Sequence, residues 1–273
     1  MHVFIITQYF PPEIGASASR WGDYVNILIK QNHEVTVLCE SPHYPHTKFY
    51  DGHANHWSNI EIKNTNLKVI RSKAYASNRK TFIKKIRHYL TFMFSAIVNS
   101  RKVKNYDLLI ISSPPLFTGV IGLYIKFFQK KEYFLDIRDL WPDSALDLGQ
   151  IKKGLIYRLG KKLELKIYKA AKGFIFTVPG FVSYFKNFPS EITRKPNFNL
   201  INGVSNDFLN ESLKLKLKPD KRFTVLYSGN IGLAQDLKTV IKSAEALKDM
   251  TFILSLSEKV FVKQKSSFLQ SPL

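Results

Sequence analysis

Four turns of this sequence carry residue types suited to binding and transferring phosphorylated groups. The first lies in VFIITQYFPPEIGASASR, where an apolar run leads to Pro11, Pro12, Glu13 and Gly15 and then to Arg20. A helix that starts at such a turn offers free N–H groups and a partial positive charge to an anion. The small residues would let a phosphate approach the backbone, and Arg20 would add a cation. A glycine required only by the backbone is the alternative.

The second turn repeats this arrangement in the last third of the chain. GNIGLAQ, from Gly229 through Asn230 to Gln235, follows the apolar segment VLYS and precedes a helical pattern. Neither glycine turn contains the dinucleotide fingerprint or a P-loop lysine. Two glycine turns of this kind predict two half-sites that face each other across a cleft.

The third turn, LDIRDLWPDSA, places charged residues directly after a buried strand. Arg138 and Asp139 beside a tryptophan are suited to contact with a substrate or to proton transfer. A structural salt bridge between Arg138 and an aspartate is the alternative. The fourth turn, SSPPL at 112–116, either takes part in the site or simply ends a strand.

The cysteine and histidine content argues against a metal site and a disulfide framework. Cys39 is the single cysteine, so a reducing cytoplasm is the simplest compartment. Four histidines fall in one turn-rich loop, at positions 43, 46, 53 and 56, without an accompanying cysteine. Because this is not a zinc-binding pattern, we expect no metal and no cofactor.

The elements that would position these turns alternate between strand and helix patterns. Such alternation predicts an α/β fold with a parallel, doubly wound sheet, and continuous apolar runs predict strands buried on both faces. The predicted strands are 1–7, 34–39, 67–71, 107–112, 133–137 and 174–178. The predicted helices are 16–30, 82–100, 116–128 and 151–171.

The alternating pattern breaks between about 189 and 220, where the chain is polar and contains proline and asparagine. A strand at 222–228, a helix at 236–248 and a strand at 251–256 then follow. We therefore predict two Rossmann-like domains, residues 1–200 and 201–273. The second has too few elements to close such a domain, and we expect it to expose apolar surface.

The charge is strongly positive, with 41 lysines and arginines against 21 acidic residues and a formal net charge of +20. This excess predicts an anionic partner. Residues 79–98 and 152–172 mix cations with large apolar residues at helical spacing, a pattern typical of helices that lie on anionic membranes. Ordinary domain helices with solvated lysines are the alternative. No nucleic-acid-binding motif accompanies the charge, so we expect no nucleic-acid partner.

The motifs together resemble those of bacterial family 4 glycosyltransferases of the GT-B fold. The matching segments cover nearly all of 1–254. They are QYFPPEIGASA, HEVTVL, SSPPLF, RDLWPD, NGV and YSGNIGLAQ. The sequence looks most similar to the subgroup that transfers N-acetylated amino sugars, such as N-acetylfucosamine, in O-antigen or capsule assembly.

This resemblance implies a function for each domain. The first would bind a lipid-diphosphate-linked saccharide acceptor and the second a nucleotide sugar, commonly a UDP-sugar. Transfer would retain the anomeric configuration and need no metal. The resemblance implies donor binding by Gly15, Arg20, Gly229, Asn230 and Gln235. It places Glu13 and Arg138 on the acceptor side and Asp139 in the turn that often carries a catalytic residue. A peripheral position on the cytoplasmic face of the cell membrane would follow.

Two features of the last domain depart from the family. We find no pair of glutamates with the expected seven-residue separation, and 255–273 does not resemble the family. We therefore expect a truncated second domain, and the truncation could abolish the activity of the chain. A non-catalytic, membrane-associated remnant or acceptor-binding domain is the second hypothesis, and a different α/β enzyme with one Rossmann domain is the third.

Overall fold

The computed structural model describes residues 1–44, 46–76, 81–204, 206–214, 223–229, 231, 235–247 and 252–257. The chain divides into two compact units, Met1–Gly203 and Val204–Leu273. We predicted a boundary after residue 200. The assignment of acceptor and donor binding to the two parts stays a prediction.

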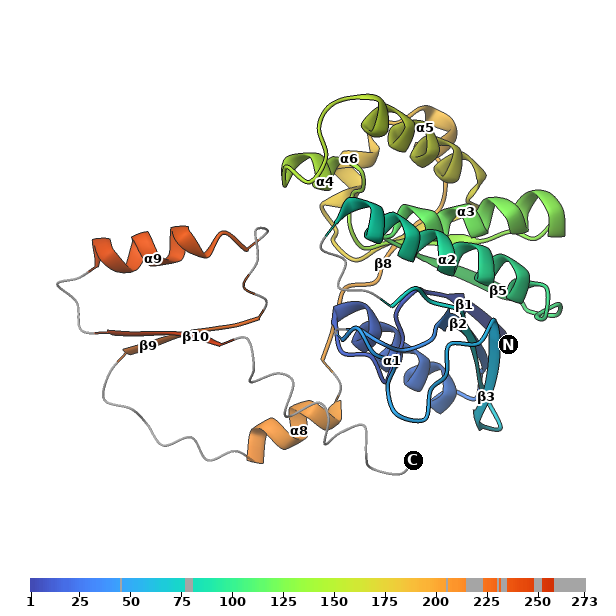
Figure 1. Ribbon diagram of the computed structural model, residues 1–273, viewed down its shortest axis with the longest axis horizontal. Coiled ribbons are helices and arrows are strands. Elements are labelled where there is room, and N and C mark those ends of the chain that lie inside the picture. Colours follow the sequence, from blue (N-terminus) through green and yellow to red (C-terminus); the bar gives the residue numbers. More distant parts are fainter. Residues whose placement is uncertain are drawn as a thin grey trace. The chain divides into compact units, whose positions relative to one another are not determined.

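Unit 1 is built on a sheet of eight strands in the order β3-β4-β2-β1-β5-β6-β7-β8 (Figure 1). All neighbouring strands are parallel except β3 and β4, which are antiparallel. The strands are β1 (His2–Ile6), β2 (Glu34–Glu40), β3 (Ser58–Asn64), β4 (Leu67–Ser72), β5 (Leu108–Ser113), β6 (Phe134–Ile137), β7 (Gly173–Phe176) and β8 (Asn197–Asn199). The predicted α/β class with a mainly parallel sheet is confirmed.

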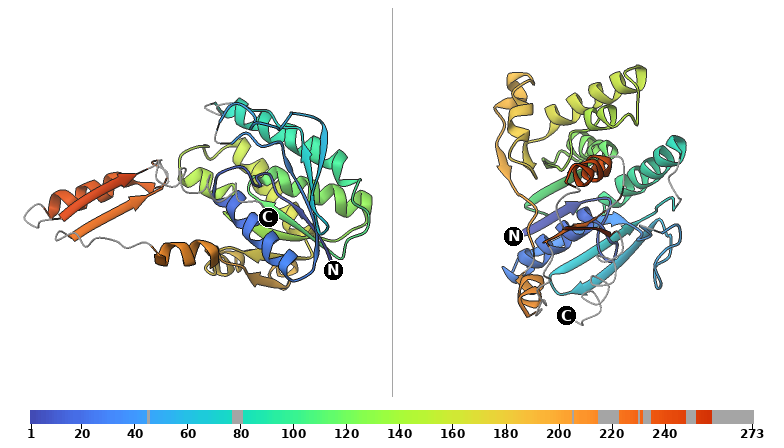
Figure 2. Two further views of the ribbon diagram at one scale, coloured as in Figure 1. Left: turned by 90° about the horizontal axis from the view of Figure 1, so that it is seen from below. Right: turned by 90° about the vertical axis from the view of Figure 1, so that its left-hand side faces the viewer.

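Helices lie on both faces of this sheet (Figures 1 and 2). The helices are α1 (Ala16–Lys30), α2 (Phe82–Ser100), α3 (Leu116–Tyr124), the π-helical turn η1 (Ile125–Gln129), α4 (Asp143–Asp147), α5 (Leu155–Ala170), α6 (Phe181–Phe185) and α7 (Ser190–Thr193). Helices α2 and α3 pack on one face, and α1 packs against β2 on the other.

Alternation along the central strand divides the core between the two faces. Phe4 and Ile6 of β1 contribute to the cluster that includes α2, α3 and α5. Val3 and Ile5 contribute to the cluster around Trp21 of α1. Because successive side chains point to opposite faces, one apolar run supplies both cores. This is why the strands read as continuous hydrophobic segments.

A lysine caps the end of α5. Lys195 Nζ donates hydrogen bonds to the carbonyl oxygens of Tyr168, Lys169 and Ala171. These carbonyls lie at the helix C-terminus, where a cation is also favoured by the helix dipole.

Unit 2, taken by itself, contains α8 (Asn206–Lys214), β9 (Phe223–Ser228), α9 (Leu237–Ala246) and β10 (Phe252–Ser257). Strands β9 and β10 pair in parallel, with Phe252 opposite Phe223. Leu226 is 63% exposed and Ile231 is 54% exposed, while Leu237 of α9 is buried. The described part of this unit thus presents apolar surface, as its sequence predicts.

Candidate functional site

The order of the strands places a site between β1 and β5. After β1 the chain adds β2, β3 and β4 on one side of β1. Helix α2 then leads back across the sheet to β5, which lies on the other side of β1. Ligands of open parallel sheets bind at the carboxyl ends of the strands, where the strand order reverses. The turns predicted to carry chemistry in unit 1 all follow strands of this sheet.

A pocket of about 160 Å³ opens at this position. Its wall comes from the segments that follow β1, β5 and β6 and from α2 and α3. The lining residues are Tyr9, Tyr89, Pro114, Pro115, Leu116, Phe117, Arg138 and Trp141. The rings of Tyr89 and Phe117 stack with their centroids 6.0 Å apart. The pocket therefore combines flat apolar surfaces with a guanidinium group.

Arg138 is held in place by the end of β5. Its Nε donates to Ser112 Oγ at 2.9 Å, and its Nη2 donates to the carbonyl oxygen of Pro114. Burial lowers the pKa of Arg138, and the nearby Asp136 carboxyl opposes this effect. The predicted alternative, a pair between Arg138 and an aspartate, is present as a 4.0 Å contact with Asp136. Arg138 thus lines the pocket and also contacts the buried Asp136.

Asp139 follows Arg138 but is exposed. Its Oδ1 accepts a hydrogen bond of 2.8 Å from the backbone N–H of Leu140. Among the described residues that line the pocket, the turn after β6 contributes Arg138 and Trp141 and not Asp139. The assignment of Asp139 as a catalytic residue stays a prediction.

Arg20 holds together three segments of unit 1. Its Nη2 donates to Asp136 Oδ1 at 2.9 Å, and both side chains are fully buried. Its Nη1 donates to the carbonyl oxygen of Leu200 at 2.7 Å and to Asn202 Oδ1 at 2.9 Å. Burial raises the pKa of Asp136, and Arg20 opposes the rise. Arg20 is therefore engaged with the protein itself, and donor binding by this residue stays a prediction.

Glu13 is also buried, at 3% exposure, and faces the loop after β2. Its Oε1 accepts hydrogen bonds from the backbone N–H groups of His43 and Tyr44, at 3.0 and 2.9 Å. Burial raises the pKa of Glu13 to about 7, against the lowering effect of these two bonds. Glu13 thus fixes the β2 loop beside the first glycine turn, and its predicted role on the acceptor side is not tested.

The glycine turns begin where the sequence places them. Gly15 is the N-cap residue of α1, and a Cβ atom built on it would come within 3.4 Å of the Tyr44 ring. Gly229 follows β9 directly, and Gln235 is exposed, whereas Asn230 lies outside the described residues. The two turns belong to different units, so the cleft predicted between them stays a prediction.

Sequence reasoning missed Tyr9, Glu40, His88 and Tyr89. Tyr9 has a local signal in the sequence, because it lies in the turn that directly follows β1, which ends at Ile6. His88 and Tyr89 lie in the middle of α2, where an aromatic residue is usually part of the core. Only the packing of α2 against β2 and β4 brings them to the strand ends.

Solved structures with a similar fold are glycosyltransferases of the GT-B fold. The catalytic domain of starch synthase IV from Arabidopsis thaliana, bound to ADP and acarbose, is similar with a TM-score of 0.59 and 12% identity, over 98% of this chain and 71% of that chain. The apo UGT2 of Phytolacca americana has a TM-score of 0.51 and 10% identity, over 97% and 70%. These likenesses concern the fold alone.

One curated protein is similar in sequence. It is WcaI of Escherichia coli (strain K12), described as a colanic acid biosynthesis glycosyl transferase, and it is 26% identical over 278 aligned positions. The alignment covers 94% of this chain, which spans 65% of the length of WcaI. Comparison with descriptions of known protein families gave no match.

Proposed function

We propose that this chain is a glycosyltransferase that acts in the assembly of a surface polysaccharide. The observation that carries the proposal is the aromatic and cationic pocket at the point where the strand order reverses. The likeness to WcaI over 94% of the chain and the GT-B fold of the structural neighbours support it.

The pocket is suited to a saccharide acceptor linked to a lipid diphosphate. Aromatic faces pack against sugar rings, and a guanidinium group is well matched to phosphate oxygens. Tyr89, Phe117 and Trp141 supply the faces, and Arg138 supplies the cation. We assign this pocket to the acceptor.

The donor in this proposal is a nucleotide sugar, most simply a UDP-linked acetamido sugar, transferred with retention of configuration. The N-terminus of the fifteen-residue helix α1 offers backbone N–H groups after Gly15. Gly229, Asn230 and Gln235 would complete donor binding from unit 2, and Asp139 would act in the transfer step. Because Arg20 is engaged with Asp136, the charge that compensates the diphosphate must come largely from other groups.

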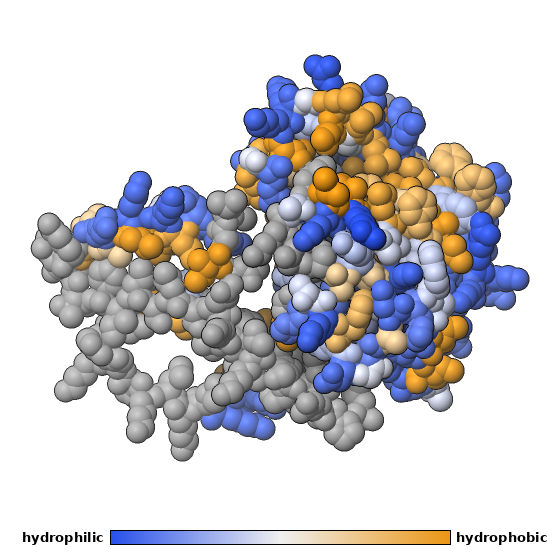
Figure 3. All heavy atoms as spheres, in the orientation of Figure 1, coloured by the Kyte–Doolittle hydropathy of each residue, from blue (hydrophilic) through white to orange (hydrophobic). Residues whose placement is uncertain are grey.

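Association with an anionic membrane is part of the same proposal. Leu155, Ile156 and Leu159 of α5 are 73%, 55% and 55% exposed, and lysines and Arg158 on or just before the helix are exposed beside them. Figure 3 shows exposed apolar side chains gathered over the part of unit 1 that carries α2, α3 and α5. None of the described helices is long and apolar enough to cross a bilayer. In this proposal the exposed apolar and basic residues of α5 attach the chain peripherally to the inner face of the cell membrane.

A transfer assay tests the activity. The purified chain is incubated with UDP-linked acetamido sugars and a polyprenyl-diphosphate-linked saccharide, and the lengthened product is detected by mass spectrometry. We expect Arg138→Ala and Trp141→Ala to raise the KM for the acceptor, while Arg194→Ala, an exposed arginine directly after α7, serves as the control. An equal rise of the KM for the acceptor in all three variants would contradict the assignment of this pocket to the acceptor.

Donor binding is measured separately by calorimetry. UDP-sugar binding by the wild type that is lost in Gly15→Trp would support the first glycine turn, because the indole ring would fill the space at the start of α1. Failure of a folded wild-type chain to bind any nucleotide sugar would favour an acceptor-binding protein without turnover.

Membrane association has its own test. We expect sedimentation with vesicles rich in phosphatidylglycerol and not with phosphatidylcholine vesicles. A Leu155→Glu, Leu159→Glu double variant should lose this binding. Binding that survives the double variant would move the contact away from α5.

A further inference from the structure

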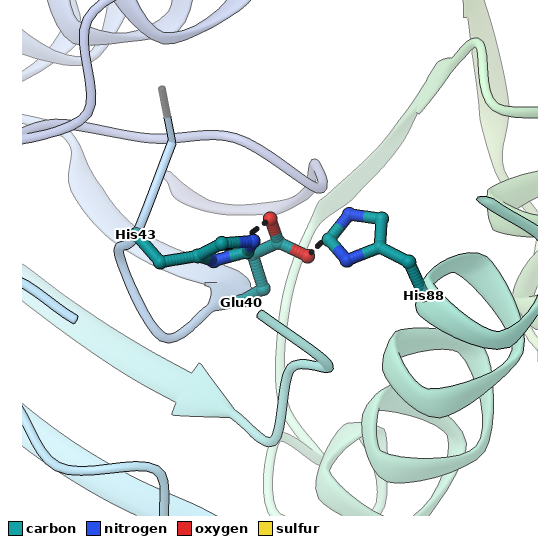
Figure 4. A group of neighbouring side chains, drawn as sticks. All are labelled: Glu40, His43 and His88. Atoms are coloured by element: carbon teal, nitrogen blue, oxygen red, sulfur yellow. Dashed lines mark ion pairs between the residues drawn. The ribbon is translucent and has the colours of Figure 1, made fainter. Parts of the chain in front are cut away.

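A buried group of acids and imidazoles lies directly behind the pocket. Glu40 at the end of β2, His43 in the following loop and His88 of α2 are each fully buried (Figure 4). One ligand atom from each of them lies within 4.8 Å of the others. His43 is one of the four histidines of the β2 loop, but its neighbours here come from other elements.

The spacing of these atoms suits a shared metal ion. His88 Nε2 is 3.4 Å from Glu40 Oε2. His43 Nδ1 is 3.6 Å from Glu40 Oε1 and 3.1 Å from the carbonyl oxygen of Ser41, so a metal ion bound through Nδ1 would replace the contact with Ser41. Ligands placed about 2.0–2.2 Å from a tetrahedral zinc ion are separated by roughly 3.3–3.6 Å. The donor set fits as well, since two imidazoles and one carboxylate are common ligands of divalent transition metals.

The orientation of His88 adds a second observation. Its Nδ1 lies 3.0 Å from the carbonyl oxygen of Tyr75, an acceptor that keeps the proton on Nδ1. The lone pair of Nε2 then points toward Glu40. Histidines that bind metals are usually oriented by such a bond from the other ring nitrogen.

Two further polar atoms at this place lack hydrogen-bond partners. Gln8 Oε1 and Glu13 Oε2 are buried, and neither has a partner among the described residues. Gln8 Nε2 lies 2.8 Å from Glu40 Oε2 and 2.6 Å from His88 Nε2, so its amide bridges the two ligands. If the amide turned over, Oε1 would face the ligands as a further oxygen donor.

From this geometry we propose that Glu40, His43 and His88 bind one divalent transition-metal ion of the zinc type. The ion would join the end of β2 to α2. This proposal does not depend on the proposed transfer activity, and it replaces the expectation of no metal that the histidine spacing gave.

Metal binding would affect the pocket through residues adjacent in sequence. Tyr9 and Tyr89 line the pocket, and they directly follow Gln8 and His88. The Tyr9 hydroxyl is also 3.4 Å from His88 Nε2, and the two rings stack. An ion that fixes His88 would thereby fix one wall of the pocket.

The test uses the full chain, treated with a chelator and exchanged into metal-free buffer, with Zn²⁺ alone as the probe. We expect calorimetry to show one equivalent of Zn²⁺ bound, and thermal melting to shift upward with Zn²⁺ but not with Mg²⁺. Co²⁺ in the same site should give the visible absorption of a tetrahedral ion. Zinc-edge absorption spectroscopy should report only nitrogen and oxygen ligands, including imidazole.

The variants His43→Gln and His88→Gln should weaken zinc binding about 100-fold or more, because each removes a ligand. His53→Gln is the matched control, since His53 Nδ1 lies 3.3 Å from Glu61 Oε1 in another histidine–glutamate pair. Circular dichroism in chelator shows whether each variant folds. If a variant does not fold, the Co²⁺ and zinc-edge spectra of the wild-type chain decide whether the site binds a metal ion. No saturable Zn²⁺ binding by the folded wild type, or equal binding by all three variants, would overturn the proposal.

Discussion

Two buried polar clusters at the carboxyl edge of the sheet differ in how their charges are balanced. In one, Arg20 and Asp136 form a 2.9 Å ion pair, and Arg20 also donates hydrogen bonds to oxygens of Leu200 and Asn202. In the other, Glu40 lies among Gln8, His43 and His88. Arginine is always charged, so the first cluster is balanced permanently. The Glu40 carboxylate instead faces an amide and two imidazoles, and the proposed metal ion would supply its balancing charge.

The largest expected effect comes from breaking the balanced cluster. Arg20→Ala removes the 2.9 Å ion-pair partner of Asp136 and leaves this buried carboxylate with only the 4.0 Å contact to Arg138. It should lower the free energy of unfolding by about 3–5 kcal/mol. Urea unfolding at neutral pH measures the loss. The exposed Arg158→Ala should change the stability by less than about 0.5 kcal/mol.

A second substitution separates lost charge balance from lost packing. Adding Asp136→Asn to Arg20→Ala removes the unpaired carboxylate and should recover part of the stability. If the double variant is no more stable than Arg20→Ala, the ion pair is not the reason for the loss.

A smaller effect is expected in the second cluster. Glu40→Gln keeps the shape of the side chain and leaves no arginine unpaired, so in metal-free buffer with chelator it should cost only about 1–2 kcal/mol. The same urea unfolding measures it. A cost equal to that of Arg20→Ala would remove the contrast between the clusters.

A third ion pair, between Asp143 and Lys161, lies nearer the surface and should contribute still less to the free energy of unfolding. Burial acts to raise the pKa of Asp143, but hydrogen bonds from Tyr184, Tyr157 and Lys161 leave this pKa below its usual value. The carboxylate therefore stabilises the fold above the unfolded pKa, and this contribution is lost as the pH falls through the folded pKa. Asp143→Asn should cost about 1 kcal/mol at pH 7.

The pH dependence of Asp143→Asn checks the sign. Its difference from the wild type should shrink as the pH falls below about 4, where the unfolded aspartate takes up a proton. Unfolding curves recorded from pH 7 downward measure this. A difference that grows with acid would show that Asp143 is not stabilised as a carboxylate.

The smallest effect concerns the residue that precedes Glu40. Cys39 is buried in the core on the opposite face of β2, and burial raises the pKa of its thiol to about 12. The folded chain should therefore react very slowly with a disulfide reagent at pH 8, because little thiolate is present. Release of the chromophore should occur only upon unfolding, and fast labelling of the native chain would show that β2 opens.

Much of the fold was predictable because the strands carry continuous apolar runs. The predicted limits of α1 and α2 match those observed, and β1, β2 and β5 differ from prediction by one residue at each end or less. Strand β3 was not among the predicted strands. Its segment Ser58–Asn64 is polar, and it pairs only with β4 at the sheet edge, so it lacks the apolar pattern of a buried strand.

The site was less predictable because it depends on contacts across the sequence. The turns after β1, β5 and β6 could be found, since charged and small residues after a strand are a local signal. The pairing of Arg20 with Asp136 could not, because 116 positions separate them. His88 likewise reaches Glu40 only through the packing of α2, which no local pattern encodes.

The cap on α5 has a consequence for chemical labelling of the protein. The ammonium group of Lys195 directs its donors at three carbonyl oxygens, whereas Lys152, Lys153 and Lys162 are exposed. An amine-acylating reagent should therefore modify the exposed lysines around α5 first and Lys195 last. The order in which these amines become acylated would report, residue by residue, whether the end of α5 remains closed in solution.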